Sequence, residues 1–286
     1  MKLGLHVPNF TWPGGAATLG PDLAEIAKAV DEGGFEYLSV MDHLFQIRGV
    51  GPAENDMLEA YITLGFIAAH TERVKLLTLV TGVHYRQPGL LAKAITTLDV
   101  LSGGRAVFGI GAGWNEEESR GLGFPYPSTK ERFELLEETL RYVREMWSDD
   151  EGPFDSAHIH AERLLNVPQP LSKPRPPIMI GGGGEKKTLR LVAKYADACN
   201  LPGEPGLEHK IDVLRGHCEA EGRDYDEITK TTLARIDPAN IDELKADLRQ
   251  KADLGFDAAF VTIPSGPKLD VIEALAKEVI PEAAGY

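Results

Sequence analysis

A run of four glycines at residues 181–184 points most directly to chemistry in this sequence. Glycines lack a Cβ atom, so their backbone can approach a ligand closely and can adopt positive φ angles. The run lies between an apolar segment and a helical pattern, where free N–H groups and the positive end of a helix dipole bind anions. Lys186 and Lys187 follow and add positive charge. We therefore expect a phosphate cradle; the alternative is an ordinary flexible turn.

His43 is the best candidate for proton transfer, because an imidazole titrates near neutral pH. Asp42 precedes it, but adjacent residues of a strand point to opposite faces, so we do not expect the two side chains to pair. The alternative is a histidine with a purely structural role. His6 and His84 also lie near expected strand ends and are weaker candidates.

The sequence offers little support for other catalytic motifs. Residues 109–113 have the spacing GxGxG, which differs from the GxGxxG fingerprint of dinucleotide-binding proteins. His158 and His160 could share one face of a strand, but no third ligand with metal spacing follows, so we expect no metal site. The sequence has no GxSxG elbow and no CxxC pair.

The elements that must position these residues alternate regularly along the chain. Short apolar runs predict eight strands, at residues 3–7, 37–41, 74–80, 106–110, 177–180, 198–201, 229–234 and 258–263. Amphipathic stretches predict eight helices, at residues 21–32, 58–70, 89–101, 129–147, 185–195, 207–221, 241–254 and 269–279. Eight strand–helix units predict an α/β fold, a (β/α)8 TIM barrel formed by one domain over residues 1–286. A doubly wound sheet is the alternative.

Two connections are longer than usual and are expected to be insertions after strands 2 and 4. They cover residues 44–57 and 149–176. Long loops in compact domains are often functional lids, although either segment could be a solvated insertion without a role in chemistry. A TIM barrel has its active site at the carboxyl ends of the strands, where His43 and the glycine run are both expected.

Composition excludes several classes of protein. The 286 residues include 30 Lys and Arg against 44 Asp and Glu, a formal charge of −14, and 43% are hydrophobic. This hydrophobic content excludes a disordered chain, and the acidic balance argues against binding to nucleic acid or to an anionic membrane. No apolar run has the length of a signal peptide or a membrane span, so we expect a cytoplasmic protein. The two cysteines, Cys199 and Cys218, are expected to be reduced and structural.

Five stretches of the chain together resemble a known family. They are Met41-Asp42-His43, residues 79–83 with Tyr85-Arg86-Gln87-Pro88, residues 98–105, residues 109–114, and residues 177–184. In this order they resemble the bacterial luciferase-like superfamily, and within it the coenzyme F420-dependent oxidoreductases. The resemblance covers nearly the whole chain.

The resemblance implies a TIM barrel that binds F420 or a flavin. It implies that the glycine run holds the cofactor phosphate and that residues 111–115 line the cofactor ring and the substrate pocket. It also implies a non-proline cis peptide bond in the third strand, at Thr78–Leu79 by position. The implied cofactor-binding residues are Asp42, His43, Thr78, Leu79, Val80, Gly111, Ala112, Gly113, Asn115, Gly181, Gly182, Gly183, Gly184 and Glu185.

One departure from the family pattern concerns the substrate. In F420-dependent sugar-phosphate dehydrogenases a catalytic glutamate directly follows the glycine motif, where this chain has Trp114. Their active-site tryptophan corresponds to a position near Ile47. Both changes disfavour glucose-6-phosphate oxidation. A pocket walled by Trp12, Phe45 and Trp114 would suit a small hydrophobic substrate, unless these aromatic residues belong to the core.

Three functions remain open from the sequence. The first is an F420-dependent oxidoreductase that transfers a hydride between the deazaflavin C5 and the substrate, with His43 as the catalytic acid or base. The second is an FMN-dependent luciferase-like monooxygenase. The third is a non-enzymatic protein that binds a flavin or deazaflavin. We also expect a homodimer, since the family is commonly dimeric and the helix after strand 2 is rich in apolar residues.

Overall fold

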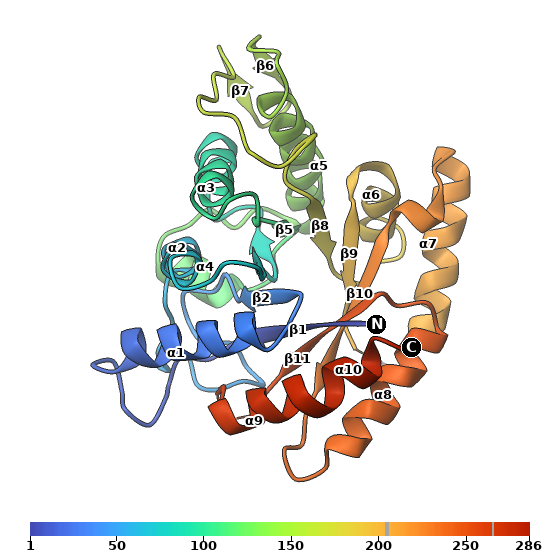
Figure 1. Ribbon diagram of the computed structural model, residues 1–286. Coiled ribbons are helices and arrows are strands. Elements are labelled where there is room, and N and C mark those ends of the chain that lie inside the picture. The colour runs from blue at the N-terminus through green and yellow to red at the C-terminus, as the bar shows by residue number, and fades with distance from the viewer. Residues whose placement is uncertain (204–205, 265) are drawn as a thin grey trace.

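A parallel β-barrel surrounded by helices forms the centre of the molecule (Figure 1). The computed structural model describes residues 1–203, 206–264 and 266–286. Its main sheet has the order β3-β2-β1-β11-β10-β9-β8-β5-β4, and every pair in it is parallel. A bridge between Leu76 and Ala106 joins β3 to the start of the fourth barrel strand and closes the sheet. The structure therefore confirms the predicted TIM barrel over the doubly wound alternative.

Eight apolar segments form the barrel, as predicted, and the third is divided into two strands. The strands are β1 (Lys2–Val7), β2 (Tyr37–Val40), β3 (Lys75–Thr78), β4 (Thr81–Gly82), β5 (Phe108–Gly111), β8 (Ile178–Gly181), β9 (Ala198–Leu201), β10 (Thr229–Arg235) and β11 (Ala258–Thr262). A cis peptide bond joins Leu79 to Val80 between β3 and β4, so the prediction of Thr78–Leu79 is wrong by one residue. Regular pairing with β2 continues through Thr78, and the Leu79 N–H still donates to the Val40 carbonyl at 2.8 Å.

Helices cover the outside of the barrel. They are α1 (Leu19–Glu32), α2 (Ala60–Ala68), α3 (Pro88–Leu101), α4 (Glu116–Gly121), α5 (Thr129–Met146), α6 (Thr188–Tyr195), α7 (Leu207–Glu221), α8 (Ile241–Asp253), α9 (Leu269–Ala274) and α10 (Ile280–Ala283). Helix α4 was not predicted, because six residues are too few for a helical periodicity to be recognised. Helix α6 begins three residues later than predicted, since residues 185–187 form a turn.

The barrel interior is filled below the carboxyl ends of its strands. A compact cluster of buried side chains from five strands and the segment before β5 closes the interior: Tyr37, Leu77, Val107, Met179, Ala198, Ala258 and Phe260. The Tyr37 and Phe260 rings lie 5.2 Å apart between centroids. The first residues of several strands contribute to this packed layer, so it lies away from the ends at which the strands finish.

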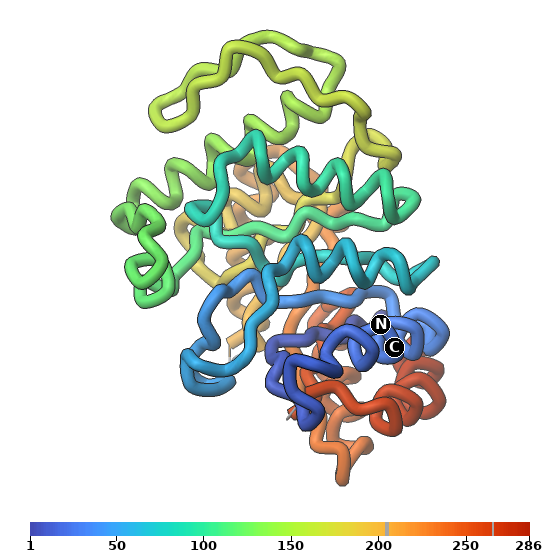
Figure 2. The backbone as a smooth tube through the Cα atoms, turned by 90° about the vertical axis from the view of Figure 1, so that its left-hand side faces the viewer, coloured from blue at the N-terminus to red at the C-terminus, as the bar shows by residue number. Residues whose placement is uncertain are grey.

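The two long connections differ in their relation to the barrel. Residues 41–59 lead from β2 to α2 and pass over the carboxyl ends of the strands. Residues 147–177 lead from α5 to β8 and include a small hairpin of β6 (Phe154–Asp155) and β7 (His160–Ala161). In Figure 2 this second segment (yellow-green) forms the upper edge of the molecule. The first connection is therefore the one that can contribute to a site at the barrel mouth.

Candidate active site

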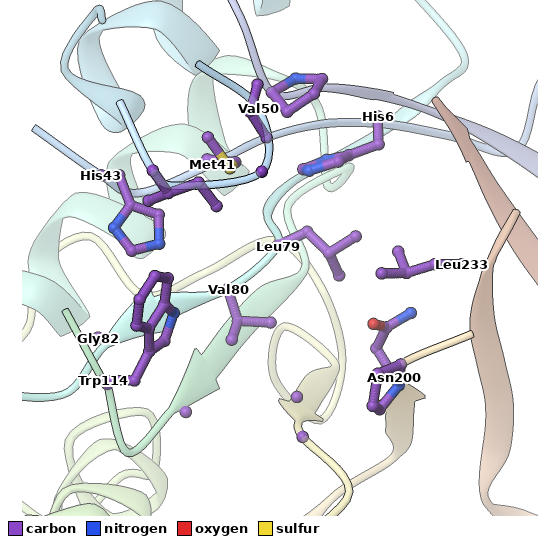
Figure 3. A pocket seen from close by; sticks show the side chains of 18 of the residues that line it. His6, Met41, His43, Val50, Leu79, Val80, Gly82, Trp114, Asn200 and Leu233 are labelled. Atoms are coloured by element: carbon purple, nitrogen blue, oxygen red, sulfur yellow. The ribbon is translucent and has the colours of Figure 1, made fainter. Parts of the chain in front are cut away.

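A cavity of about 1200 Å³ opens at the carboxyl ends of the barrel strands. It is larger than most sites for a single drug-sized molecule, which enclose roughly 300–1000 Å³. Figure 3 shows His43 and Trp114 together on one side of this cavity, Asn200 and Leu233 on the other, and Leu79 and Val80 between them. The space is thus sufficient for an extended ligand together with a second, smaller molecule.

The four glycines predicted as a phosphate cradle all line this cavity. Gly182 has φ of +123°, a conformation that residues with a side chain rarely adopt. A Cβ atom on Gly184 would lie 2.8 Å from the Thr188 hydroxyl, which also lines the cavity. The N–H groups of Gly183 and Gly184 have no hydrogen-bond partner among the described residues. The turn therefore presents free backbone donors to the cavity.

Arg132, near the start of α5, adds a buried positive charge to the cavity wall. Its guanidinium donates to the Pro127 carbonyl at 2.6 Å and stacks on the Tyr126 ring, 4.3 Å from its centroid. Its Nε is buried without a partner, and no carboxylate of the described residues forms an ion pair with it. A buried charge without a counterion is costly. Together with the free amides of the glycine turn, Arg132 fits an anionic group such as a phosphate.

His43 follows β2 and lines the cavity on the side of Trp114. Its Nδ1 lies 2.5 Å from Glu118 Oε1, and its ring meets the Trp114 ring at 65° with 5.4 Å between centroids. The Tyr85 hydroxyl donates to the same Glu118 oxygen at 2.5 Å. Burial alone would raise the pKa of Glu118, but the hydrogen bonds from His43, Tyr85 and the Leu44 amide outweigh it and lower this pKa to about 2. Glu118 is therefore a buried carboxylate anion.

Asp42 points away from His43, as the strand alternation predicts, and belongs to a separate ion-pair cluster. Arg86 donates to both oxygens of Asp42, at 2.6 and 2.9 Å, and also bonds Glu59. The Tyr61 ring packs on the guanidinium, 4.6 Å from ring centroid to Cζ. Burial opposes the charge of Arg86, but its two carboxylate partners outweigh burial and raise the pKa of Arg86. This cluster supports the segment that carries His43.

The cavity lining contains three polar residues that were not predicted from the sequence or, for His6, were considered a weaker candidate. His6 of β1 lines the cavity and bonds the Ser39 hydroxyl at 2.9 Å, and burial lowers its pKa to about 4. Asn200 of β9 lines the opposite side, and its amide donates to the Thr231 hydroxyl at 3.0 Å. Arg235 ends β10 at the cavity wall. All three stand at carboxyl ends of barrel strands, which is the sequence signal that could have found them.

Several predicted site residues do not line the cavity. Asp42 faces Arg86, and the Thr78 hydroxyl bonds Thr81 and the Gly109 carbonyl. Asn115 precedes α4, and the partly exposed Glu185 pairs with Lys210. The remaining predicted cofactor-binding residues are in the lining: His43, Leu79, Val80, Gly111, Ala112, Gly113 and the four glycines.

Of the three aromatic residues that were predicted to wall a substrate pocket, Trp114 lines the cavity and Trp12 and Phe45 do not. Trp114 is 56% exposed and lines the cavity beside His43. Trp12 instead turns into the core, where its Nε1 donates to the Asn9 carbonyl at 2.8 Å and its ring lies against Gly266. Phe45 packs against α4, where a Cβ atom on Gly121 would lie 2.9 Å from its ring. Both rings therefore pack against the protein rather than line the cavity.

No group of three His, Cys, Asp or Glu side chains within the described ranges is arranged to hold a metal ion. His160 bonds Asp155 at 2.5 Å, and His158 lies 3.5 Å from Glu134. Searched over the same ranges, no helix has the length and apolar character needed to cross a membrane.

Comparison with known proteins adds a family to this geometry. Residues 1–250 match the family model described as luciferase-like monooxygenase. The chain is 32% identical over 229 residues to an F420-dependent glucose-6-phosphate dehydrogenase of Nakamurella multipartita, covering 77% of this chain and 65% of the relative. It is 27% identical over 230 residues to an FMNH2-dependent dimethylsulfone monooxygenase of Pseudomonas putida, covering 74% and 61%.

A solved structure is similar over almost its entire length. An F420-dependent secondary alcohol dehydrogenase, solved in complex with an F420–acetone adduct, superposes with a TM-score of 0.83 at 18% identity and covers 99% of this chain and 98% of that one. At this identity the similarity establishes the shared barrel fold.

Proposed function

Because this chain belongs to the luciferase-like monooxygenase family, we propose that it is a coenzyme F420-dependent oxidoreductase. The observation that carries the proposal is a single cavity that combines the glycine turn and Arg132 with His43. Two similar proteins that are named as F420-dependent support this cofactor class. One is the glucose-6-phosphate dehydrogenase found by sequence, and the other is the secondary alcohol dehydrogenase found by structure. The reaction is transfer of a hydride between the deazaflavin C5 and a small hydrophobic substrate.

Separate parts of the cavity hold the separate parts of the cofactor. The glycine turn, Thr188 and Arg132 hold the phosphate, because they supply free backbone donors and a buried positive charge. Leu79, Val80 and residues 111–113 line the ring. When bound, F420 supplies a hydride acceptor or donor. His43 takes or gives the proton at its ring nitrogen on the cavity side.

Apolar residues form the wall nearest His43 and favour a hydrophobic substrate. Ile47 and Val50 come from the connection after β2, and Trp114 comes from the loop after β5. Trp114 supplies a broad ring face, which suits planar or apolar molecules. The absence of a carboxylate at position 114 argues against a sugar phosphate as the substrate.

Binding of the cofactor tests the proposal directly. We expect the purified protein to bind F420 more tightly than FMN when absorbance is followed during titration. Gly182→Ala should raise the Kd for F420 by about 10- to 100-fold, since displaced backbone donors to a charged group are worth roughly 1.5–3 kcal/mol. Gly222→Ala is the matched control, because Gly222 also has positive φ but ends α7 away from the cavity.

Two outcomes would replace this proposal with the alternatives. Tight FMN binding without F420 affinity would support an FMN-dependent monooxygenase, which the Pseudomonas putida relative represents. Tight F420 binding without turnover on a panel of alcohols, ketones and enones would support a non-enzymatic carrier.

The homodimer is proposed from an exposed apolar face of α2. Ile62 and Phe66 are four residues apart on one face of this helix and are 77% and 37% exposed. Leu90 at the start of the neighbouring α3 is also exposed. An isolated apolar patch of this kind is typical of a protein–protein interface.

Light scattering during gel filtration tests the dimer. The wild-type protein should have twice the 31.2 kDa mass of one chain. Ile62→Glu should weaken association roughly 100-fold or more, because it places a carboxylate in an apolar interface at a cost of a few kcal/mol. Leu269→Glu, at an exposed leucine of α9, should leave the mass unchanged. A wild-type protein that is monomeric at high micromolar concentration would exclude this interface.

A further inference from the structure

Glu118 connects His43 to the protein interior through a saturated set of hydrogen bonds. Its side chain is fully buried in α4. It receives hydrogen bonds from His43 Nδ1 and the Tyr85 hydroxyl on Oε1, both at 2.5 Å. The Leu44 and Phe45 amides donate to Oε2 at 2.6 and 3.1 Å. Both carboxylate oxygens therefore serve only as acceptors.

This arrangement determines which nitrogen of His43 carries the hydrogen. An ionised carboxylate cannot donate a hydrogen bond, so the short contact requires an N–H at Nδ1. In the neutral imidazole the hydrogen is then on Nδ1, and Nε2 has a free lone pair. The His43 side chain lines the cavity beside Trp114, as Figure 3 shows, whereas Glu118 is not among the residues that line it. Nε2 is thus the nitrogen left for a ligand.

The other ionisable groups around His43 do not supply a competing charge. His6 faces the cavity from β1 and His84 lies in the loop after β4, and burial lowers the pKa of each to about 4, so both are neutral at pH 7. Asp42 is neutralised by the two hydrogen bonds from Arg86. Glu118 is therefore the anion that acts on the His43 ring.

We propose that Glu118 is the positioning residue for proton transfer: it holds His43 as the Nδ1–H tautomer and directs Nε2 at the reacting substrate. This inference rests on the proposed oxidoreductase function. In the oxidative direction an alcohol substrate loses a hydride from carbon to the cofactor and its hydroxyl proton to Nε2, and the C=O bond forms. The resulting imidazolium is stabilised by the Glu118 carboxylate. In the reverse direction the same imidazolium returns the proton to the carbonyl oxygen.

The helix register explains why Glu118, rather than a neighbouring acid, has this position. Three glutamates follow Asn115, and Glu116 and Glu117 are exposed while Glu118 is buried. Glu117 therefore offers a matched control, because its change to glutamine removes the same charge from the adjacent residue. Tyr85→Phe removes one hydrogen bond from Glu118 without removing its charge.

Nitrogen NMR of the cofactor-free protein tests the inference independently of turnover. In wild-type protein, at a pH where His43 is neutral, we expect its hydrogen on Nδ1. In Glu118→Gln the acidic limb of the pH profile of kcat/KM should move to lower pH, because the neighbouring anion that favours imidazolium is lost. Glu117→Gln should leave this profile unchanged, and Tyr85→Phe should retain the Nδ1–H tautomer.

The wild-type measurement tests the inference even if the Glu118→Gln variant does not fold. A neutral His43 with its hydrogen on Nε2 would refute the inference without any substitution. An unchanged pH profile of kcat/KM in a folded Glu118→Gln variant would refute it equally. If the Nδ1–H tautomer is found but F420 does not bind, the proposed cofactor is wrong while the role of Glu118 toward His43 stands.

Discussion

Replacing His43 with alanine should lower kcat by about 100- to 10,000-fold, the usual contribution of a positioned general acid or base. The Kd for the cofactor should change little, because the phosphate cradle and the ring-lining loop lie on other elements, β8 and β5. The variant should fold, since the Tyr85 hydroxyl and two backbone amides remain as donors to Glu118. Steady-state kinetics and cofactor titration on the same preparation measure both quantities.

Two further substitutions separate proton transfer from structural support. His43→Asn retains a side-chain N–H that can reach Glu118 but has no titratable nitrogen toward the cavity. It should be as inactive as the alanine variant if His43 transfers a proton, and nearly as active as wild type if His43 only supports α4. His160→Ala, in the exposed hairpin of β6 and β7, should retain full activity. Unchanged turnover in His43→Ala would remove this residue from the mechanism.

The fold could be predicted from the sequence because strands buried on both faces are short and continuously apolar. All eight barrel segments were found, and their order led to the correct architecture. The errors in the predicted strands and in the cis peptide bond occur where the local hydrophobic pattern does not distinguish one residue from the next. The third barrel segment is continuously apolar from Val74 to Val80, so hydrophobicity could not indicate that regular pairing ends at Leu79.

The site was only partly predictable, because its key contacts join distant residues. The glycine turn could be recognised since it is contiguous in sequence and its chemistry belongs to the backbone. The partner of His43 lies 75 positions away, in a helix of six residues. Trp12 and Phe45 were assigned to the pocket by residue type, but aromatic type alone does not distinguish a cavity wall from the core. Which side chains pair, and which of them face the cavity, could be learned only from the three-dimensional structure.

Arg86→Met should destabilise the protein by about 3–5 kcal/mol, the usual cost of leaving one member of a buried ion pair uncompensated. Methionine retains much of the side-chain volume and can still pack on Tyr61, so the loss reports mainly the charge. Asp42 is 2% exposed, and burial already raises the pKa of its carboxyl against the opposing effect of Arg86. Without Arg86 this carboxyl would be buried with no charged partner in the cluster except the repelling Glu59.

The pH dependence of this loss identifies its electrostatic origin. With Arg86 removed, the folded-state pKa of Asp42 should lie further above its unfolded value, so protonation favours the folded protein. The variant should therefore be closest to wild type in acid and lose stability as pH rises through that folded-state pKa. Urea unfolding at pH 5 and pH 8 would measure this trend. Asp42→Asn combined with Arg86→Met should recover part of the loss and remove its pH dependence.

An exposed ion pair elsewhere in the protein is the control for the stability loss expected in Arg86→Met. Arg163 pairs with Glu151 at 2.5 Å, but the two side chains are 62% and 48% exposed. Arg163→Met should cost less than about 1 kcal/mol, because solvent screens an exposed pair and replaces its hydrogen bonds. If Arg86→Met is equally mild, the cluster around Asp42 is not needed to hold the segment that carries His43. A large, pH-dependent difference between the two variants would instead show that this buried charge network supports the barrel mouth.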